Sequence, residues 1–251
     1  MKDTAEAIVA WLREQVEAAN AKGLVVGVSG GLDSAVVAHL IKRAFPNDSL
    51  GVMMPLKSNP VDMEDAGEVV ESCDLQSLTI DLTATHETMY SEIRKRLGNT
   101  FNQQNDRMAD ANLRARLRMS TLYTIATNHH YLVVGTDNAA EWYMGYFTKY
   151  GDGAADLQPI IDLTKTEVRE LASYLGVPSQ VVEKKPSADL WAGQTDEAEM
   201  GTTYDAIDAF LKGEPVSEAD QAIIDKMHRN TAHKRTIPNQ FHTKKRKITA
   251  K

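Results

Sequence analysis

Six consecutive residues near the N-terminus have the side chains and backbone freedom to bind a phosphate group: Ser29-Gly30-Gly31-Leu32-Asp33-Ser34. The two glycines let the backbone approach an anion closely, and the two serines add hydroxyl donors. The aspartate would repel a phosphate unless a metal ion lay between the two charges. The segment therefore predicts a site for a nucleotide whose pyrophosphate is bound together with Mg²⁺.

The residues on either side of this segment predict a turn from a strand into a helix. Residues 24–28 are an apolar run typical of a buried parallel strand, and residues 35–41 are a second run typical of a helix. Backbone N–H groups at the positive end of such a helix favour an anion. A tight turn in which Ser and Asp only cap the helix is the alternative interpretation.

The motif differs from the two best-known phosphate-binding loops. It lacks the Gly-Lys-Ser/Thr of the Walker P-loop and the G-x-G-x-x-G of dinucleotide-binding folds. It resembles instead the PP-loop of the ATP pyrophosphatases. That resemblance implies cleavage of ATP to AMP and pyrophosphate.

A second polar segment, residues 135–141, follows the apolar run 131–135. The carboxyl ends of parallel strands meet at one edge of a sheet, so Thr136 and Glu141 should lie beside the PP-loop, within reach of a Mg²⁺–phosphate. Capping of a helix N-terminus by Thr136 or Asp137 is the alternative interpretation.

A third candidate is Asp152, which lies between two glycines in the sequence Gly151-Asp152-Gly153. The glycines permit an irregular loop that can direct the carboxylate into a site.

From Gly135 to Glu167 the chain is similar to the ammonia-dependent NAD synthetase family. Further segments resemble that family in order along the chain: 112–119, 185–190, 195–197 and 233–235.

The resemblance implies a reaction in two steps. ATP adenylylates the nicotinate carboxylate of deamido-NAD and releases pyrophosphate, and ammonia then displaces AMP to give NAD. The implied ATP-binding residues are Ser29, Gly30, Gly31, Asp33, Ser34, Thr136, Lys165 and Ser187. The implied deamido-NAD-binding residues are Asn112, Arg116, Lys149, Asp156, His233 and Lys234. Mg²⁺ is assigned to Asp33 and Glu141, and catalytic roles to Asp33, Asp152 and Lys165.

Elementary chemistry agrees with these assignments. Attack of a carboxylate on a polyanion needs Mg²⁺ and cations such as Lys165 to neutralise charge. Ammonium is not nucleophilic, so a carboxylate such as Asp152 has a proton to accept. The adenylate must meet ammonia before water, which predicts a closing lid. The polar segment 184–201, which contains proline and glycine, is the candidate for that lid.

The strand after the PP-loop helix departs from the family pattern. Many members have an arginine where this chain has Met53-Met54-Pro55, and Lys57 is the only cation nearby. The sequence therefore does not show which residue holds the adenosine or the α-phosphate at the end of this strand. The cluster of Arg114, Arg116 and Arg118 is consistent with a solvated helix face, and the resemblance favours only Arg116.

The order of apolar runs predicts the elements that position these residues. Strands are expected at 24–28, 50–54, 77–81 and 131–135, and helices at 4–20, 62–73, 84–97, 106–128 and 164–175. The helix 84–97 has Met89, Ile93 and Leu97 on one face, and Thr164 with Glu167 predicts a capping box at the start of the helix 164–175. Residues 178–203 show no clear periodicity and are expected to form a long loop, and two short helices follow near 203–212 and 217–229. We expect an α/β fold, a doubly wound parallel sheet with flanking helices of the adenine nucleotide alpha hydrolase-like type.

Length and composition bound the class of protein. The 251 residues fit a single domain, 1–251, without a glutaminase domain, with a basic C-terminal tail at about 242–251. The net charge of −7 argues against nucleic-acid binding, and no apolar run is long enough for a membrane span. The single cysteine, Cys73, favours a cytoplasmic location. The resemblance implies a homodimer, which the long helix 106–128 supports only weakly.

Two alternative functions remain open at this point. Another PP-loop enzyme, such as a tRNA thiolase or the synthetase part of a GMP-forming enzyme, would need a basic tRNA surface or a different acceptor site. A nucleotide sensor without catalysis predicts loss of the acidic site residues, yet Asp33, Glu141 and Asp152 are all present.

Overall fold

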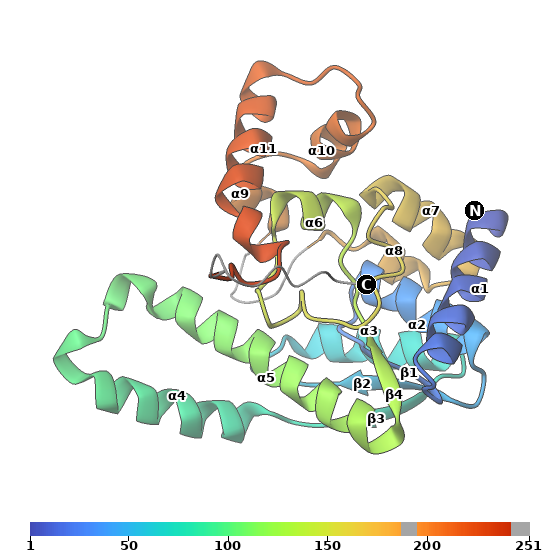
Figure 1. Ribbon diagram of the computed structural model, residues 1–251, viewed down its shortest axis with the longest axis horizontal. Coiled ribbons are helices and arrows are strands. Elements are labelled where there is room, and N and C mark those ends of the chain that lie inside the picture. The colour runs from blue at the N-terminus through green and yellow to red at the C-terminus, as the bar shows by residue number, and fades with distance from the viewer. Residues whose placement is uncertain (187–194, 242–251) are drawn as a thin grey trace.

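A four-stranded parallel sheet forms the centre of the protein (Figure 1). The computed structural model describes residues 1–186 and 195–241. The strands are β1 (Gly23–Gly27), β2 (Ser49–Met53), β3 (Gln76–Thr79) and β4 (Tyr131–Val134), in the spatial order β3-β2-β1-β4. The four predicted strands and the doubly wound α/β class are confirmed.

The strand order places a topological switch point between β1 and β4. From β1 the chain continues outward through β2 and β3, and it returns to the other side of β1 only with β4. In the register of the sheet, Val26 pairs with Val134 on one side and with Gly51 on the other. Ligands of such sheets bind in the crevice at the carboxyl ends of the strands where the order reverses.

Helices cover both faces of the sheet. On one face Leu24 and Val26 pack in a core with α1 (Lys2–Ala18), α2 (Leu32–Ala44), α3 (Pro60–Ser72) and α7 (Lys165–Leu175). On the other face Val25 packs with β2 and with α5 (Asp106–His129). Alternate residues of β1 thus face opposite layers, which is why its sequence is apolar without a break.

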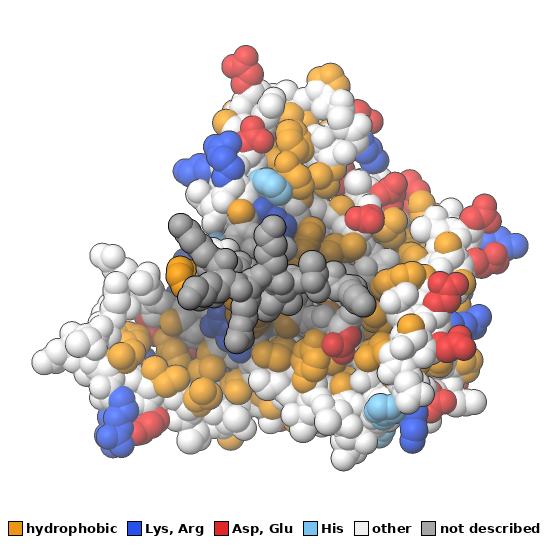
Figure 2. Space-filling view, in the orientation of Figure 1, with side chains coloured by type: hydrophobic (Ala, Val, Ile, Leu, Met, Phe, Trp, Pro, Cys, Tyr) orange, Lys and Arg blue, Asp and Glu red, His pale blue; other side chains and the backbone are white. Residues whose placement is uncertain are grey.

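An arm extends from the sheet on the side of α5. It consists of α4 (Thr83–Leu97), two 3₁₀ turns at Gly98–Thr100 and Gln103–Asn105, and the first half of α5 (Figure 1). Three apolar residues that were expected on one face of α4, Met89, Ile93 and Leu97, are exposed. Figure 2 shows acidic and basic side chains interspersed over one side of the molecule, with hydrophobic side chains gathered along α5.

A smaller helical group lies beyond the carboxyl ends of the strands. It contains α6 (Ala139–Met144), α9 (Asp196–Met200), α10 (Tyr204–Leu211) and α11 (Glu218–Asn230), followed by the 3₁₀ turn Ala232–Lys234. These helices share a separate apolar core that includes Met144, Ile207 and Ile224. The group therefore places α6 and α10 over the end of the sheet where the site is expected.

Two local predictions need correction. Residues 178–203 contain α8 (Ser179–Glu183) and α9, which are too short to show periodicity in the sequence. The cap of α6 is Asn138, rather than Thr136 or Asp137, because Asn138 forms a reciprocal capping box with Glu141. Ser187, residues 187–194 of the expected lid and the basic tail 242–251 lie outside the described residues.

Among the described residues, no helix is both long and apolar enough to span a bilayer.

Candidate active site

A cavity of about 730 Å³ opens at the carboxyl ends of β1 and β4. It lies at the topological switch point, where the sequence places the PP-loop and the segment after β4. Ten of the predicted site residues line it: Ser29, Gly31, Asp33, Ser34, Asn112, Thr136, Glu141, Asp152, Lys165 and Lys234. The fold therefore brings together residues that are far apart in the chain.

The PP-loop is held by its own hydrogen bonds. Ser34 Oγ accepts from the Ser29 N–H at 3.2 Å and donates to the Gly31 carbonyl at 3.0 Å. Gly30 has a φ of +81°, and a Cβ atom there would lie 2.3 Å from the Asp62 carbonyl oxygen. Only glycine fits at this position, where the loop packs against α3. Gly30 does not line the cavity, so its assigned contact with ATP remains a prediction.

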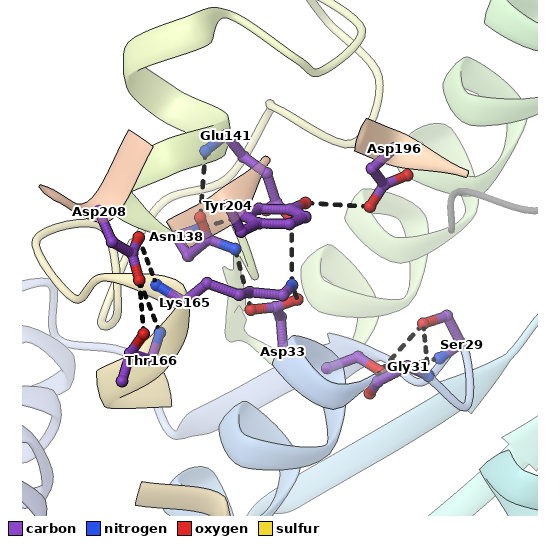
Figure 3. Close-up of polar contacts among 11 residues, drawn as sticks. Ser29, Gly31, Asp33, Asn138, Glu141, Lys165, Thr166, Asp196, Tyr204 and Asp208 are labelled. Atoms are coloured by element: carbon purple, nitrogen blue, oxygen red, sulfur yellow. Dashed lines mark hydrogen bonds and ion pairs between the residues drawn. The ribbon is translucent and has the colours of Figure 1, made fainter. Parts of the chain in front are cut away.

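Lys165 links the two acids that were assigned to Mg²⁺. Its ammonium donates to Asp33 Oδ2 and lies 3.4 Å from Glu141 Oε1 (Figure 3). Asn138 Nδ2 donates to the other oxygen of Asp33 at 3.1 Å. The Lys165 residue is only 2% exposed, so its charge is compensated by the two carboxylates inside the protein.

The position of Lys165 is fixed by the start of α7. Thr164 and Glu167 form the capping box predicted from the sequence. Asp208 of α10, which is buried, accepts from the Lys165 N–H at 3.1 Å and from the Thr166 N–H at 2.9 Å. The helix N-terminus thus has its free N–H groups satisfied from two directions, which holds Lys165 in place.

Tyr204 joins the same network, although the sequence analysis did not single it out. Its hydroxyl lies 3.1 Å from Glu141 Oε1 and 3.0 Å from Asp196 Oδ2 (Figure 3). A phenol donates one proton, so it can serve only one of these two carboxylates at a time. Burial and the nearby Asp33 raise the pKa of Glu141 to about 7, with Lys165 opposing the shift.

The charge of this cluster suits a divalent cation. Asp33, Glu141 and Asp196 bring three carboxylates, and among the described residues in contact with them Lys165 is the cation. No group of three or more acidic, histidine or cysteine side chains in the described chain is arranged to hold a metal alone. Mg²⁺ commonly uses one or two carboxylates and takes its other ligands from phosphate and water, so Asp33 and Glu141 fit that ion.

Asp152 projects into the cavity from the loop after Thr148. Both of its carboxylate oxygens accept from the Thr148 N–H at 3.2 Å, and the Thr148 hydroxyl donates to Asn112 Oδ1 at 2.8 Å. Asp152 is an exposed residue of the open cavity. Partial desolvation by the surrounding protein raises its pKa, while the Thr148 hydrogen bonds and the charge of Lys234 oppose that shift. The carboxylate is therefore a stronger proton acceptor than an aspartate with the ordinary pKa.

Lys234 reaches the cavity from the 3₁₀ turn after α11. Its ammonium donates to the carbonyls of Gly145 at 2.8 Å and Phe147 at 2.6 Å. Burial lowers its pKa, and Asp152 acts in the opposite direction.

Four residues that the resemblance assigned to deamido-NAD do not line the cavity of this chain. Arg116 Nη2 donates to the Lys149 carbonyl at 3.3 Å, and the Lys149 ammonium donates to the His233 carbonyl. Asp156 accepts from the Val133 N–H at 2.8 Å and braces the edge of β4. These residues lie outside the cavity, so their assigned roles remain predictions.

Arg118 lines the cavity and was not expected there. Its Nε donates to the Met54 carbonyl at 3.2 Å and its Nη2 to Ser58 Oγ at 3.3 Å. The guanidinium thus reaches the end of β2, where the sequence lacks the arginine of many family members. Helical spacing alone does not show whether Arg118 faces solvent or the cavity. Only the packing of α5 against the end of β2 places it in the cavity.

The fold and this site define a nucleotide-binding α/β protein of the PP-loop class. The family model described as NAD synthase matches residues 4–246. The chain belongs to the NAD synthase family.

Relatives and solved structures agree with this assignment. The chain is 58% identical over 233 residues to the ammonia-dependent NAD⁺ synthetase of Alkaliphilus oremlandii, covering 92% of this chain and 93% of the relative. The structure of an NMN synthetase from Francisella tularensis matches with a TM-score of 0.90 at 40% identity, covering 96% and 98% of the two chains. The NAD⁺ synthetase of Burkholderia pseudomallei matches with a TM-score of 0.79 at 30% identity, covering 94% and 90%.

Proposed function

We propose that this protein is a ligase that converts deamido-NAD to NAD, using ATP and ammonia and releasing AMP and pyrophosphate. The observation that carries the proposal is the contact of Lys165 with Asp33 and Glu141 beside a PP-loop, in a chain of the NAD synthase family. Acids and a lysine around a nucleotide-phosphate loop suit attack on the α-phosphate of ATP.

In the first step the nicotinate carboxylate attacks the α-phosphorus of ATP, and pyrophosphate leaves. The PP-loop and Thr136 bind the phosphates, and Lys165 balances the charge that develops on them. Asp33 and Glu141 would hold Mg²⁺, which when bound supplies positive charge to the triphosphate. The contact of Ser187 with ATP remains a prediction, because Ser187 lies outside the described residues.

In the second step ammonia attacks the acyl carbon, and AMP leaves with the bridging oxygen. Asp152 accepts a proton from ammonium as it enters. The raised pKa of this carboxyl and its place in the cavity support the role. Three further statements remain predictions. The protein uses free ammonia or takes it from a partner protein, segment 184–201 closes as a lid, and the protein is cytoplasmic.

A second candidate acceptor is nicotinate mononucleotide, which the same chemistry would convert to NMN. The fold similarity to the Francisella NMN synthetase, at a TM-score of 0.90, favours it.

A direct comparison of the two acceptors tests the proposal. Purified protein with ATP, Mg²⁺ and ammonium should form NAD, AMP and pyrophosphate in equal amounts from deamido-NAD, with a higher kcat/KM than for nicotinate mononucleotide. Chromatography of the nucleotides measures each product. A higher kcat/KM for the mononucleotide would make the protein an NMN synthetase, and amidation of neither acceptor would contradict the proposal.

We infer that the protein is a homodimer and that the arm formed by α4 and α5 is the contact. Met89, Ile93, Leu97 and Met108 are 47%, 38%, 45% and 52% exposed on this arm. Exposed apolar residues gathered in one place are typical of an interface. A contact of the arm with a second chain could also bring Arg116 and its neighbours to the partner's site.

A charge placed in the apolar row of α4 tests the dimer. Wild-type protein should have twice the 27.7 kDa mass of one chain in light scattering, and Ile93→Glu should shift it to the monomer. Lys95→Glu is the matched control, since it places the same side chain on the opposite side of the helix. A monomeric wild-type protein, or an Ile93→Glu dimer, would count against this interface.

A further inference from the structure

Arg118 differs from two other cations of the cavity, Lys165 and Lys184, in its hydrogen-bond partners, and resembles Lys234, which donates to two backbone carbonyls. Lys165 contacts Asp33 and Glu141, and Lys184 contacts Asp62 and Asp65 at 2.5 and 2.6 Å. The hydrogen bonds of Arg118 go instead to a backbone carbonyl and a serine hydroxyl, which are neutral. No carboxylate of the described residues lies within ion-pair distance of its guanidinium.

The positive charge of Arg118 is therefore not neutralised by the described part of the protein. Burial lowers its pKa to about 10, Arg114 acts in the same direction, and only the more distant Asp152 opposes them. Arg114 has its own partner, since its Nη2 lies 2.9 Å from Asp110 Oδ2. The residue is half-buried, so its guanidinium has lost part of its hydration without gaining an anion, and an incoming anion offsets that cost.

The geometry leaves N–H groups of Arg118 available for such an anion. A guanidinium carries five N–H donors in one plane, and two of its nitrogens each make one hydrogen bond, to Met54 and Ser58. Those two bonds fix the plane at the end of β2, in the same cavity as Asp152 and close enough for the two charges to interact. The side chain is thus oriented before a ligand arrives, which lowers the entropy lost on binding.

We propose that Arg118 binds an anionic oxygen of the two reacting groups, either the α-phosphate of ATP or the nicotinate carboxylate. The inference deepens the proposed function and rests on it. Both groups are anionic before the carboxylate attacks phosphorus, so their approach needs a cation beside them. Arg118 supplies it from α5, through a guanidinium held at the end of β2. Arg118 accepts no proton and forms no covalent bond in this role.

Binding measurements separate the two sources of the anion. Isothermal titration calorimetry is carried out on wild type, Arg118→Met and Arg118→Lys with three ligands: α,β-methylene-ATP with Mg²⁺, deamido-NAD and NAD. Loss of a charge-assisted hydrogen bond should weaken binding by about ten- to a hundredfold in the Met variant. The Lys variant should lose less, because it keeps the charge without the planar fork.

The pattern of losses identifies the group that is bound. A loss for the ATP analogue alone assigns Arg118 to the α-phosphate, and a loss for deamido-NAD but not NAD assigns it to the carboxylate. Arg169→Met removes an exposed arginine of α7 outside the cavity and should change neither.

Affinities within twofold of wild type for all ligands would overturn the proposal. So would an equal loss for NAD and deamido-NAD together with a lower melting temperature, which a purely structural brace on Met54 would produce. The proposed function is tested separately, since absence of amide formation by wild-type protein would refute it whatever these affinities are.

Discussion

Replacing Asp33 by asparagine is expected to reduce pyrophosphate release by roughly a thousandfold, a loss typical for charge stabilisation at a reacting centre. Asp33 contacts Lys165 and receives a hydrogen bond from Asn138, and it is one of the two acids that fit Mg²⁺. The amide keeps the shape of the side chain but cannot balance a divalent cation or Lys165. Quench-flow measurement of pyrophosphate with ATP, Mg²⁺ and deamido-NAD reports the loss.

The protein should nevertheless stay folded, because Lys165 retains Glu141 as a partner. Circular dichroism checks this, and Glu170→Gln provides a matched control, since it neutralises an exposed acid on the same helix as Lys165. Turnover of Asp33→Asn close to wild type at saturating Mg²⁺ would contradict a role in holding the metal–phosphate.

Replacing Asp152 by asparagine is expected to slow the second step by about a hundred- to ten-thousandfold, the usual range for a general base. Pyrophosphate should still form in the presence of deamido-NAD, because the adenylate forms before ammonia enters. Rapid quenching of a single turnover, with pyrophosphate and NAD measured in the same samples, separates the two steps. Asp205→Asn, at an exposed position on α10, is the control.

The pH dependence follows from the raised pKa of Asp152. The carboxyl group accepts a proton only above that pKa, so the wild-type amidation rate should fall as the pH drops through it. The defect of the variant should shrink as the pH rises and ammonia replaces ammonium. If Asp152 only braces the loop through Thr148, both products would fall together and no pH would restore either.

The arrangement of the sheet was predictable because each strand is an apolar run in the sequence. Apolar runs separated by helical segments of sufficient length allow parallel strands and little else. Once the order of strands is known, the segments after β1 and β4 must meet at one edge, which explains why Asp33, Thr136 and Glu141 were correctly expected to lie together. Asp152 was first singled out by the two glycines that flank it, and Lys165 entered the prediction through the family resemblance.

Other features depend on contacts between distant parts of the chain. Tyr204 reaches Glu141 only because α10 packs on α6, and Asp208 caps α7 from 43 residues away. Arg118 contacts Met54 across 64 residues, and no spacing within α5 indicates that contact. The exposed row of Met89, Ile93 and Leu97 was recognised as one face, but periodicity cannot tell a face that meets the core from one that does not.

The transfer of a labelled oxygen tests the central proposal most directly. Deamido-NAD carrying ¹⁸O in both carboxylate positions is incubated with the protein, ATP, Mg²⁺ and ammonium, and the nucleotides are analysed by mass spectrometry. Attack on the α-phosphorus followed by displacement of AMP predicts one ¹⁸O atom in AMP, one in the amide of NAD and none in pyrophosphate. Unlabelled AMP, or label in pyrophosphate, would contradict an adenylated intermediate at this site.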